Sequence, residues 1–356
     1  MGLFSRSALF LSLGAAVAVT GSVKADDASM VIRDHKIGYV TTQMHWSVYQ
    51  TADLKKDCPQ GLNDHGPREN FKALYPNGGT VEGTQLTREA LRVFPEDHKP
   101  QFPYILRKGP IAIGMNLDGK VGPNDFVSPE GVKGIKNNLF KVLGCNANYR
   151  APEGQMALFS NKLIAGFTFD RIMLELSNVD NIDNQDNVDV TIYRGRDPLL
   201  LDGTGEKVAP GGTQRVDMHY GKALIQHLHG RIKDGVLTTD PVKEGIWPWA
   251  NYFDRPAVLA FHDMRFQLKL TANGADGLIA GYVDTKSYYN WVTSWSTHHL
   301  AYGQLDPDEF WWAVRNNSDA YPDEKGQMTA ISSAITLNMA QVFIVHPDEK
   351  VAAADQ

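Results

Sequence analysis

The chain has 356 residues, of which 42% are hydrophobic and 21% are charged, as is typical of globular proteins. This length allows one large domain or two ordinary domains with a substantial core. The formal net charge of −6 becomes −8 when residues 1–25, which carry Arg6 and Lys24 and no acid, are set aside. This acidic balance argues against general binding to nucleic acid or to anionic membranes.

Residues 1–25 have the pattern of a secretory signal peptide. Arg6 gives a positive start, Ala8–Val19 is a short apolar core, and Val23 and Ala25 fit the positions before a cleavage site. The apolar core is too short for a comfortable membrane span, and no other run approaches about 18 apolar residues. We therefore expect a periplasmic or secreted protein with no transmembrane span after the signal is cleaved.

Cys58 and Cys145 are the only two cysteines in the chain. In an oxidising compartment, an even pair predicts a disulfide. It would close a loop of about 87 residues and contribute roughly 4 kcal/mol in the chain-entropy model. Two buried free thiols are the alternative. The spacing excludes a haem c attachment site and a zinc ribbon.

Residues 26–150 are expected to form an irregular N-terminal arm with a few short elements, tied down by the disulfide. Ile37–Val40 and His45–Tyr49 are each compatible with a strand. A short helix is predicted over Thr87–Phe94, with Thr87 as its N-cap and Pro95 as its stop signal.

The stretch Ile111–Cys145 begins with an oxygen-rich loop. Asn116, Asp118 and Asp125 occupy positions 3, 5 and 12 of an EF-hand-like calcium loop, whose position 1 is here a glycine. The run NLDGKV resembles the calcium loops of dockerin modules over about a dozen residues. The alternative is a β-hairpin, because the Asp-Gly dipeptide in this run is a favoured two-residue turn.

A helix is predicted directly after this loop. Ser128 is a suitable N-cap, Pro129 fits the first helical position, and Gly144 can end the helix. Its apolar face would consist of residues that recur at helical spacing: Val132, Ile135, Leu139 and Val142.

From residue 151 to residue 347 the hydrophobic period is two, which indicates half-buried antiparallel strands. The clearest examples are residues 172–176, 188–192, 266–270 and 278–283. Asp234–Gly235 predicts a hairpin turn. Several strands without alternating long helices predict a mainly β fold, specifically an antiparallel β-sandwich of the jelly-roll or lectin-like kind.

The C-terminal part contains a clear helix-start pattern at Asp306–Glu309, with a capping residue followed by proline. The helix is expected to carry Phe310, Trp311 and Val314 inward and to end near Asn316. Residues 330–345 are compatible with a strand pair or a helix and are expected to return to the sandwich. Residues 348–356 are expected to be a disordered tail.

A second acidic segment lies between two predicted strands and carries Asp180, Asp183 and Asp186. Clustered carboxylates repel one another unless they are solvated or neutralised by a cation. The segment therefore predicts either a second calcium site or a solvated hairpin loop.

His227 and His229 alternate along a predicted strand, so their side chains share one face. Such a pair is common in zinc and copper sites, which need at least a third ligand. The alternative is a pair of hydrogen-bonded surface histidines.

Aromatic residues gather in two runs, WPWANYF and SYYNWVTSW. Exposed aromatic faces bind sugar rings and other flat ligands, whereas buried ones fill the core. The residues of a candidate ligand groove are Trp247, Trp249, Tyr252, Tyr288, Tyr289, Trp291 and Trp295.

These observations lead to three hypotheses. The first is an exported, calcium-stabilised β-sandwich that binds an extracellular ligand such as a glycan. The second is a periplasmic zinc or copper enzyme that uses the His-x-His pair, and the third is a structural envelope protein. The chain has no Gly-x-Ser-x-Gly elbow, phosphate loop or His-Glu-x-x-His motif, so no catalytic residue is assigned.

Overall fold

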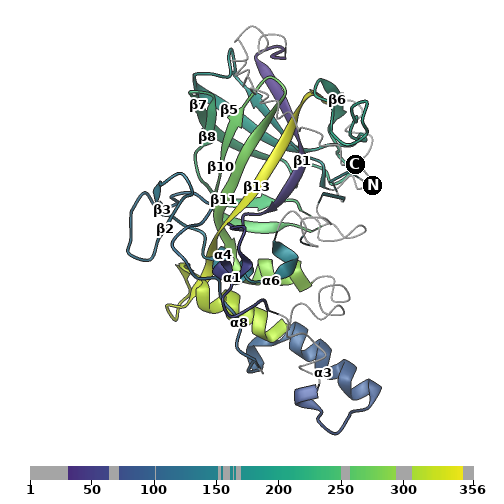
Figure 1. Cartoon of the computed structure of the whole chain (residues 1–356). Helices are drawn as coiled ribbons and strands as arrows, with labels where there is room; N and C mark the ends of the chain where they lie inside the picture. The colour runs from purple at the N-terminus through teal and green to yellow at the C-terminus, as the bar shows by residue number, and fades with distance from the viewer. Residues whose placement is uncertain are drawn as a thin grey trace, which may run out of the picture.

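The protein is mainly β with a few short helices (Figure 1). The computed structural model describes residues 31–63, 72–100, 102–150, 154, 161–162, 164–165, 170–249, 257–293 and 307–347. The predicted signal peptide (1–25) and C-terminal tail (348–356) lie outside the described residues.

The main sheet is a closed antiparallel barrel of eight strands. In spatial order the strands are β1 (Lys36–Trp46), β4 (Ile172–Ser177), β5 (Gln185–Arg194), β7 (Gln226–Lys233), β8 (Val236–Thr239), β10 (Leu259–Leu270), β11 (Gly274–Asp284) and β13 (Met328–Val345). Pairing of β13 with β1 closes the circle. Three short strands extend it: β6 (Gly212–Arg215) and β12 (Ala320–Pro322) pair with β13, and β9 (Val242–Trp247) pairs with β10.

The prediction of a mainly β, antiparallel fold is confirmed, but the predicted sandwich is wrong. Alternation shows only that one face of each strand is buried, and this holds for a barrel as well as for a sandwich. The deciding contact is between strands from opposite ends of the chain, where Gly38 pairs with Val342 and Trp46 with Ile335. The region expected to be an irregular arm therefore supplies one strand of the barrel.

The strands expected from period-two alternation are present. Residues 172–176, 188–192, 266–270 and 278–283 lie in β4, β5, β10 and β11, respectively. Asp234 (φ 51°) and Gly235 (φ 76°) form the predicted turn between β7 and β8. Residues 330–345 belong to the single long strand β13.

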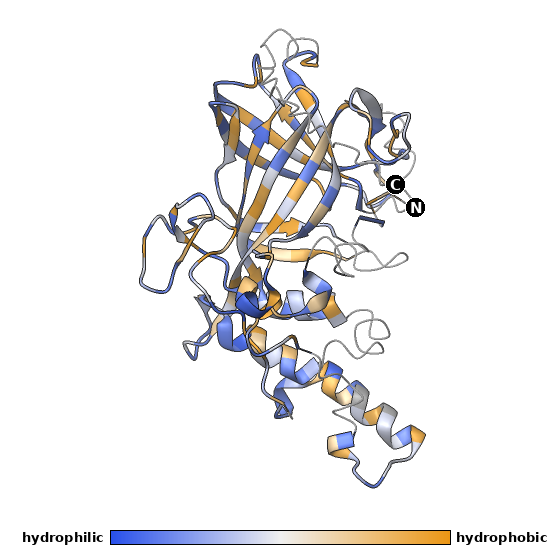
Figure 2. Ribbon diagram, viewed as in Figure 1, coloured by the Kyte–Doolittle hydropathy of each residue, from blue (hydrophilic) through white to orange (hydrophobic). Residues whose placement is uncertain are grey.

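The inward-facing residues of these strands form one apolar core. Figure 2 shows hydrophobic and hydrophilic residues following one another along the strands. Leu174, Ile192, Phe266 and Leu268 are completely buried, and each comes from a strand whose neighbouring residues point the other way. Burial of a large apolar side chain contributes about 1.5–3 kcal/mol, so this core is a main source of stability.

The helices are α1 (Leu54–Asp57), α3 (Val81–Val93), α4 (Leu139–Leu143), α6 (Thr285–Thr293) and α8 (Pro307–Asn317), with the 3-10 turns η2 (Pro95–Asp97) and η3 (Ala147–Tyr149). α4, α6 and α8 gather at one end of the barrel, and α3 extends away from it (Figure 1). In the described part of the chain, no helix combines the length and apolar character needed to cross a membrane.

Two helix predictions need correction, and one is confirmed. The helix expected over Thr87–Phe94 begins six residues earlier, because Thr80 caps it by accepting a hydrogen bond from the Gly83 backbone. The C-terminal helix is present, and its Phe310 and Val314 side chains are buried as expected, whereas Trp311 is only half-buried. Its predicted cap, Asp306, lies outside the described residues.

The helix predicted after Ser128 is wrong over its first half. Residues Phe126–Val127 (β2) and Lys133–Ile135 (β3) pair as a two-stranded sheet, and the helix α4 begins only at Leu139. Gly131 (φ 91°) and Gly134 (φ 82°) adopt left-handed backbone conformations that break a helix.

Candidate ligand-binding pocket

The stretch Ile111–Cys145 forms most of the wall of an open pocket outside the barrel, with a volume of about 390 Å³. Two residues from distant parts of the chain complete the wall: Tyr282 on β11 and Asp319 just before β12. Small-molecule sites have volumes of about 300–1,000 Å³, so this pocket is large enough for a small ligand. We call it the Lys136 pocket.

Lys136 bridges two of the acidic residues of the predicted calcium loop. Its Nζ lies 2.6 Å from Asp125 Oδ1 and 3.2 Å from Asp118 Oδ2. Burial alone would lower the pKa of Lys136, but its hydrogen bonds to the two carboxylates raise it above the usual value. Burial likewise opposes ionisation of Asp118, yet hydrogen bonds from the Lys120 backbone and from Lys136 give that carboxyl a lowered pKa. Both shifts favour the charged forms of Lys136 and Asp118.

Lys141 of α4 also lines the pocket, and its ammonium group forms no hydrogen bond or ion pair with any described residue. Its Nζ lies 5.2 Å from the centre of the Phe126 ring. Burial lowers the pKa of Lys141, and the negative charges of Asp319 and Asp125, which raise it, only partly offset this effect. Burial raises the pKa of Asp319, and hydrogen bonds from the Ser332 backbone and hydroxyl only partly offset this. Burial therefore makes the ionised form of each group less stable than it is in water.

Tyr282 contributes its ring and hydroxyl to the pocket, and the hydroxyl has no hydrogen-bond partner among the described residues. Burial, together with the charges of Asp319 and Asp118, raises the pKa of Tyr282 to about 12, so the hydroxyl keeps its proton and acts as a donor. The ring of Tyr321 packs edge-on against Tyr282 at 5.9 Å.

Tyr321 is held in place by a strained arrangement. Tyr321 (φ 57°) and Asp263 (φ 53°) both have left-handed backbones, and the Tyr321 hydroxyl donates a 2.7 Å hydrogen bond to the Asp263 carboxylate. The ring of His262 stacks on Tyr321 at 4.1 Å, beside an irregularity in the β10–β11 pairing. Such conformations cost about 1–3 kcal/mol each and cluster at functional sites. Here they fix the aromatic ring behind Tyr282.

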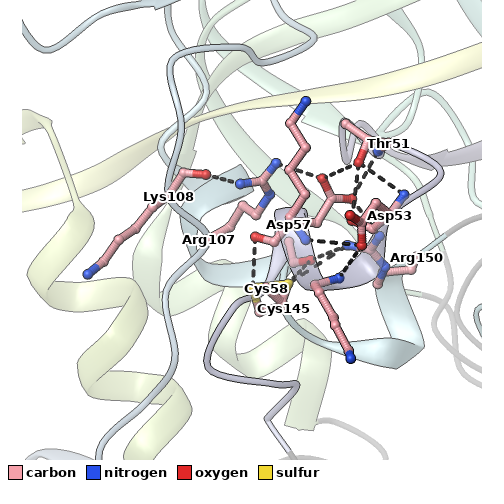
Figure 3. Close-up of polar contacts among 11 residues, drawn as sticks. Thr51, Asp53, Asp57, Cys58, Arg107, Lys108, Cys145 and Arg150 are labelled. Atoms are coloured by element: carbon pink, nitrogen blue, oxygen red, sulfur yellow. Dashed lines mark hydrogen bonds and ion pairs between the residues drawn. A yellow bond between two sulfur atoms is a disulfide. The ribbon is translucent and has the colours of Figure 1, made fainter.

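A buried ionic network holds α4 in position (Figure 3). The Asp57 carboxylate is completely buried and accepts hydrogen bonds from Arg107 (2.9 Å), Arg150 (2.8 Å) and both the backbone and hydroxyl of Thr51. Burial alone would raise the pKa of Asp57, but the hydrogen bonds from Arg150 and Thr51 and the charge of Arg107 lower it. The backbone of Arg107 donates to Lys141 O at 2.7 Å.

The predicted disulfide between Cys58 and Cys145 is confirmed, and it lies in this network (Figure 3). Arg150 also donates a 2.8 Å hydrogen bond to the Gly144 carbonyl, one residue before the disulfide. The disulfide and the Asp57 network therefore anchor the C-terminal end of α4, which fixes the backbone of Lys141.

The remaining part of the predicted calcium loop is a compact turn. The Asn116 side chain accepts a hydrogen bond from Gly119 N and donates one to Lys120 O. The expected hairpin is absent, because Met115 bridges to Lys136 and not to the residues just after the turn. Within the described ranges, no group of three or more His, Cys, Asp or Glu side chains is arranged to hold a metal ion. Calcium binding here stays a prediction.

The second acidic segment lies between β4 and β5. Asp180 forms a 2.6 Å ion pair with exposed His35, and the Asp183 carbonyl accepts a hydrogen bond from Gly235. Asp186 is an exposed residue of β5. The structure does not bring these carboxylates into the Lys136 pocket.

His227 and His229 lie on the exposed face of β7, on the same side as predicted. His227 Nδ1 is 3.1 Å from the Thr191 hydroxyl, and His229 Nδ1 is 2.6 Å from Asp189 Oδ1. No third donor joins them among the residues that the structure describes. A zinc or copper site at this pair stays a prediction.

The described aromatic residues of the predicted ligand groove are buried at the helical end of the barrel. Trp46 contacts the rings of Trp249 at 5.5 Å and Trp291 at 6.1 Å. None of the five is more than 3% exposed: Trp247, Trp249, Tyr288, Tyr289 and Trp291. Tyr252 and Trp295 lie outside the described residues. Ligand binding by these rings stays a prediction.

Sequence reasoning missed four of the six ionisable residues of the pocket: Lys136, Lys141, Tyr282 and Asp319. Only the density of polar residues in Ile111–Cys145 pointed to this region. No protein-family model, curated protein or solved structure matches the chain. The function is therefore argued from the chemistry of the site.

Proposed function

We propose that the protein binds a small polyhydroxylated molecule of the carbohydrate class in the Lys136 pocket. The supporting observation is the convergence of unpaired donors and carboxylate acceptors on one cavity. Lys141 and Tyr282 supply donors without a partner among the described residues, and the Asp118, Asp125 and Asp319 carboxylates supply acceptors.

The charge of the pocket favours a neutral ligand. Its lining contains the two lysines and the three aspartates, so acids exceed bases by one. Lys136 is already neutralised by its two carboxylate partners. A strongly anionic ligand would meet the excess of acid, whereas a sugar hydroxyl both donates and accepts and can match both kinds of group.

The Tyr282 ring gives this polar pocket one aromatic surface. Sugar rings present apolar C–H faces, for which an aromatic ring is a suitable partner. The Tyr321 ring and the Asp263 hydrogen bond behind it hold Tyr282 in one orientation, which lowers the ordering cost of binding.

We also propose that the protein is exported. The signal-peptide pattern at residues 1–25 and the Cys58–Cys145 disulfide support this, because disulfides persist mainly in oxidising compartments.

Calorimetric titration with a panel of neutral monosaccharides and disaccharides tests the binding proposal. Tyr282→Phe removes only a hydroxyl and should weaken binding about 2- to 10-fold, as expected for one neutral hydrogen bond. Lys141→Met removes a charged donor and keeps the length of the side chain, so the loss should be about 10- to 100-fold. Lys269→Met, at an exposed site on β10, is the matched control and should bind like the unchanged protein.

The proposal would be abandoned if no sugar in the panel binds, or if both pocket variants bind as tightly as the control. Preferential binding of acetate or inorganic phosphate over every sugar would instead identify an anion site.

A further inference from the structure

A second cavity, of about 230 Å³, lies between α8 and residues 102–106. Its walls are mostly apolar and aromatic, with Phe102, Pro103, Tyr104 and Leu106 on one side and Trp312 on the other. Trp312 is fixed because its indole N–H donates a 2.8 Å hydrogen bond to the His98 carbonyl. We call this cavity the Glu309 pocket.

The Glu309 carboxylate lines this cavity although its residue is only 4% exposed. Oε1 accepts a 3.0 Å hydrogen bond from the Phe102 backbone N–H. Among the described residues, Oε2 has no hydrogen-bond partner, and no lysine, arginine or histidine forms an ion pair with this carboxylate. Burying an ionised carboxylate costs free energy unless a hydrogen bond or an ion pair offsets the lost hydration. At Glu309 the hydrogen bond to Oε1 offsets part of this cost, but nothing described offsets it at Oε2.

The neighbouring titratable groups do not provide a positive partner. They are Asp308 on the same helix, His98, Lys99 and Tyr104 on the facing segments, Arg92 on α3 and Lys141 on α4, and no described cation is among the groups that shift the pKa of Glu309. Asp308 is buried and adds a negative charge, and Tyr104 donates its hydroxyl to the Val142 carbonyl. Arg92 is paired with Glu89, and Lys141 faces the other pocket. Burial and the charge of Asp308 raise the pKa of Glu309 to about 7.

We propose that the Glu309 pocket binds a small organic ammonium ion, with the cation against Glu309 Oε2 and its alkyl groups against the rings of Tyr104 and Trp312. An aromatic wall attracts a cation through the ring quadrupole, and a carboxylate with one free oxygen supplies the ion pair. This site is separate from the Lys136 pocket and does not depend on carbohydrate binding.

Binding of the cation competes with a proton for the same carboxylate. The ammonium ion binds the ionised form of Glu309, so its affinity should be highest above a pKa of about 7 and should fall as the pH decreases. Between about pH 8 and about pH 5 the ionised fraction falls roughly 100-fold, and the affinity should fall by the same factor.

The test uses choline as the probe and its uncharged isostere 3,3-dimethyl-1-butanol as the control ligand, followed by NMR or by tryptophan fluorescence. The full protein should bind choline saturably at about pH 8, much more weakly at about pH 5, and should prefer it to the alcohol at least about 10-fold. Glu309→Gln keeps an oxygen for the Phe102 N–H and should abolish this preference. Glu324→Gln, an exposed site, is the matched control.

Three results would overturn the proposal: no saturable choline binding by the folded protein, equal affinity for the uncharged alcohol, or unchanged binding by Glu309→Gln. Circular dichroism of each variant establishes that the barrel is intact. Should Glu309→Gln fail to fold, Trp312→Leu provides a second variant, which should weaken choline binding more than binding of the alcohol.

Discussion

Asp57 and Glu309 are both buried carboxyl groups, but their surroundings have opposite effects. Two arginines and a threonine surround Asp57, and its pKa is lowered. Glu309 receives one backbone hydrogen bond and faces the negative charge of Asp308, and its pKa is raised. Because a pKa difference between the folded and unfolded states makes stability depend on pH, the two groups should be distinguishable by experiment.

Replacing Asp57 should destabilise the protein strongly. Asp57→Asn leaves the guanidinium groups of Arg107 and Arg150 without their charged partner, and breaking a buried pair costs about 3–5 kcal/mol. Urea denaturation at neutral pH measures this loss. Asp276→Asn, at an exposed position whose carboxylate accepts a hydrogen bond from Asn338, should change the stability by less than about 0.5 kcal/mol.

The contribution of Asp57 to folding stability should also depend on pH. Its folded pKa lies below the unfolded value of 3.8, so its stabilisation is present above pH 3.8 and is lost as the pH falls through the lower folded value. The stability difference between the unchanged protein and Asp57→Asn should therefore shrink in strong acid. A difference that stays constant would show that the carboxylate charge is not responsible.

The effect of Glu309 on folding stability should have the opposite dependence on pH. Its pKa of about 7 exceeds the usual 4.5, so the folded state holds the proton more tightly and stability decreases as the pH rises from 4.5 to 7. Glu309→Gln should remove this decrease. The stability change that the substitution causes in the ligand-free protein should therefore be more favourable above pH 7 than in acid, by up to about 3 kcal/mol. Thermal melting of both proteins across this pH range measures the effect, and parallel curves would contradict it.

At the scale of the elements, the segment from β2 to α4 shows how glycines override an apolar pattern. Residues 132–142 have helical spacing, but Gly131 and Gly134 adopt positive φ, and β3 forms instead. The sequence shows both glycines, but not that Gly134 packs against the Asn116–Lys120 turn, which lies earlier in the chain.

The two glycines provide a matched pair of variants. A Cβ at Gly134 would lie 2.6 Å from the Lys120 carbonyl, whereas a Cβ at Gly131 would meet nothing within 4 Å. Gly131→Ala should cost about 1 kcal/mol of backbone strain, and Gly134→Ala should cost at least about 1 kcal/mol more because the turn must also move. Urea denaturation compares them, and equal losses would show that the contact with Lys120 is unimportant.

Much of the fold could be predicted from local pattern, but little of the site could. β4, β5 and β10 follow directly from the alternation of apolar residues that face the barrel core, although the outer face of β4 is buried as well. The Lys136 pocket depends on Tyr282 and Asp319, which belong to elements far from residues 118–141 in the sequence. Neither residue stands in a recognisable motif, so only the fold shows that they meet Lys141.

At the scale of the whole molecule, local sequence pattern likewise does not distinguish a barrel from a sandwich. Alternation indicates which side of a strand is buried but not which strand is its neighbour. β1 has apolar residues at Ile37, Tyr39 and Met44, and its place in the sheet follows only from its pairing with both β4 and β13.

The disulfide should stabilise the whole molecule without determining the barrel. Cys58 and Cys145 are 87 residues apart and lie outside the barrel strands. Replacing both with alanine should lower the free energy of unfolding by roughly 4 kcal/mol, by releasing the closed loop in the unfolded chain. The urea midpoint should fall while the far-ultraviolet circular dichroism of the folded protein stays that of a β protein. An unchanged midpoint, or loss of the β signal without denaturant, would contradict this.

The pairing of β1 with β13 has a consequence for biosynthesis. A ribosome makes Lys36–Trp46 early, but this strand must wait for Ile335–Val342 before its second edge is covered. Until then, the nascent chain presents an open strand edge to which other chains can add. A chaperone that shields this edge should therefore matter most in the interval before the last strand emerges.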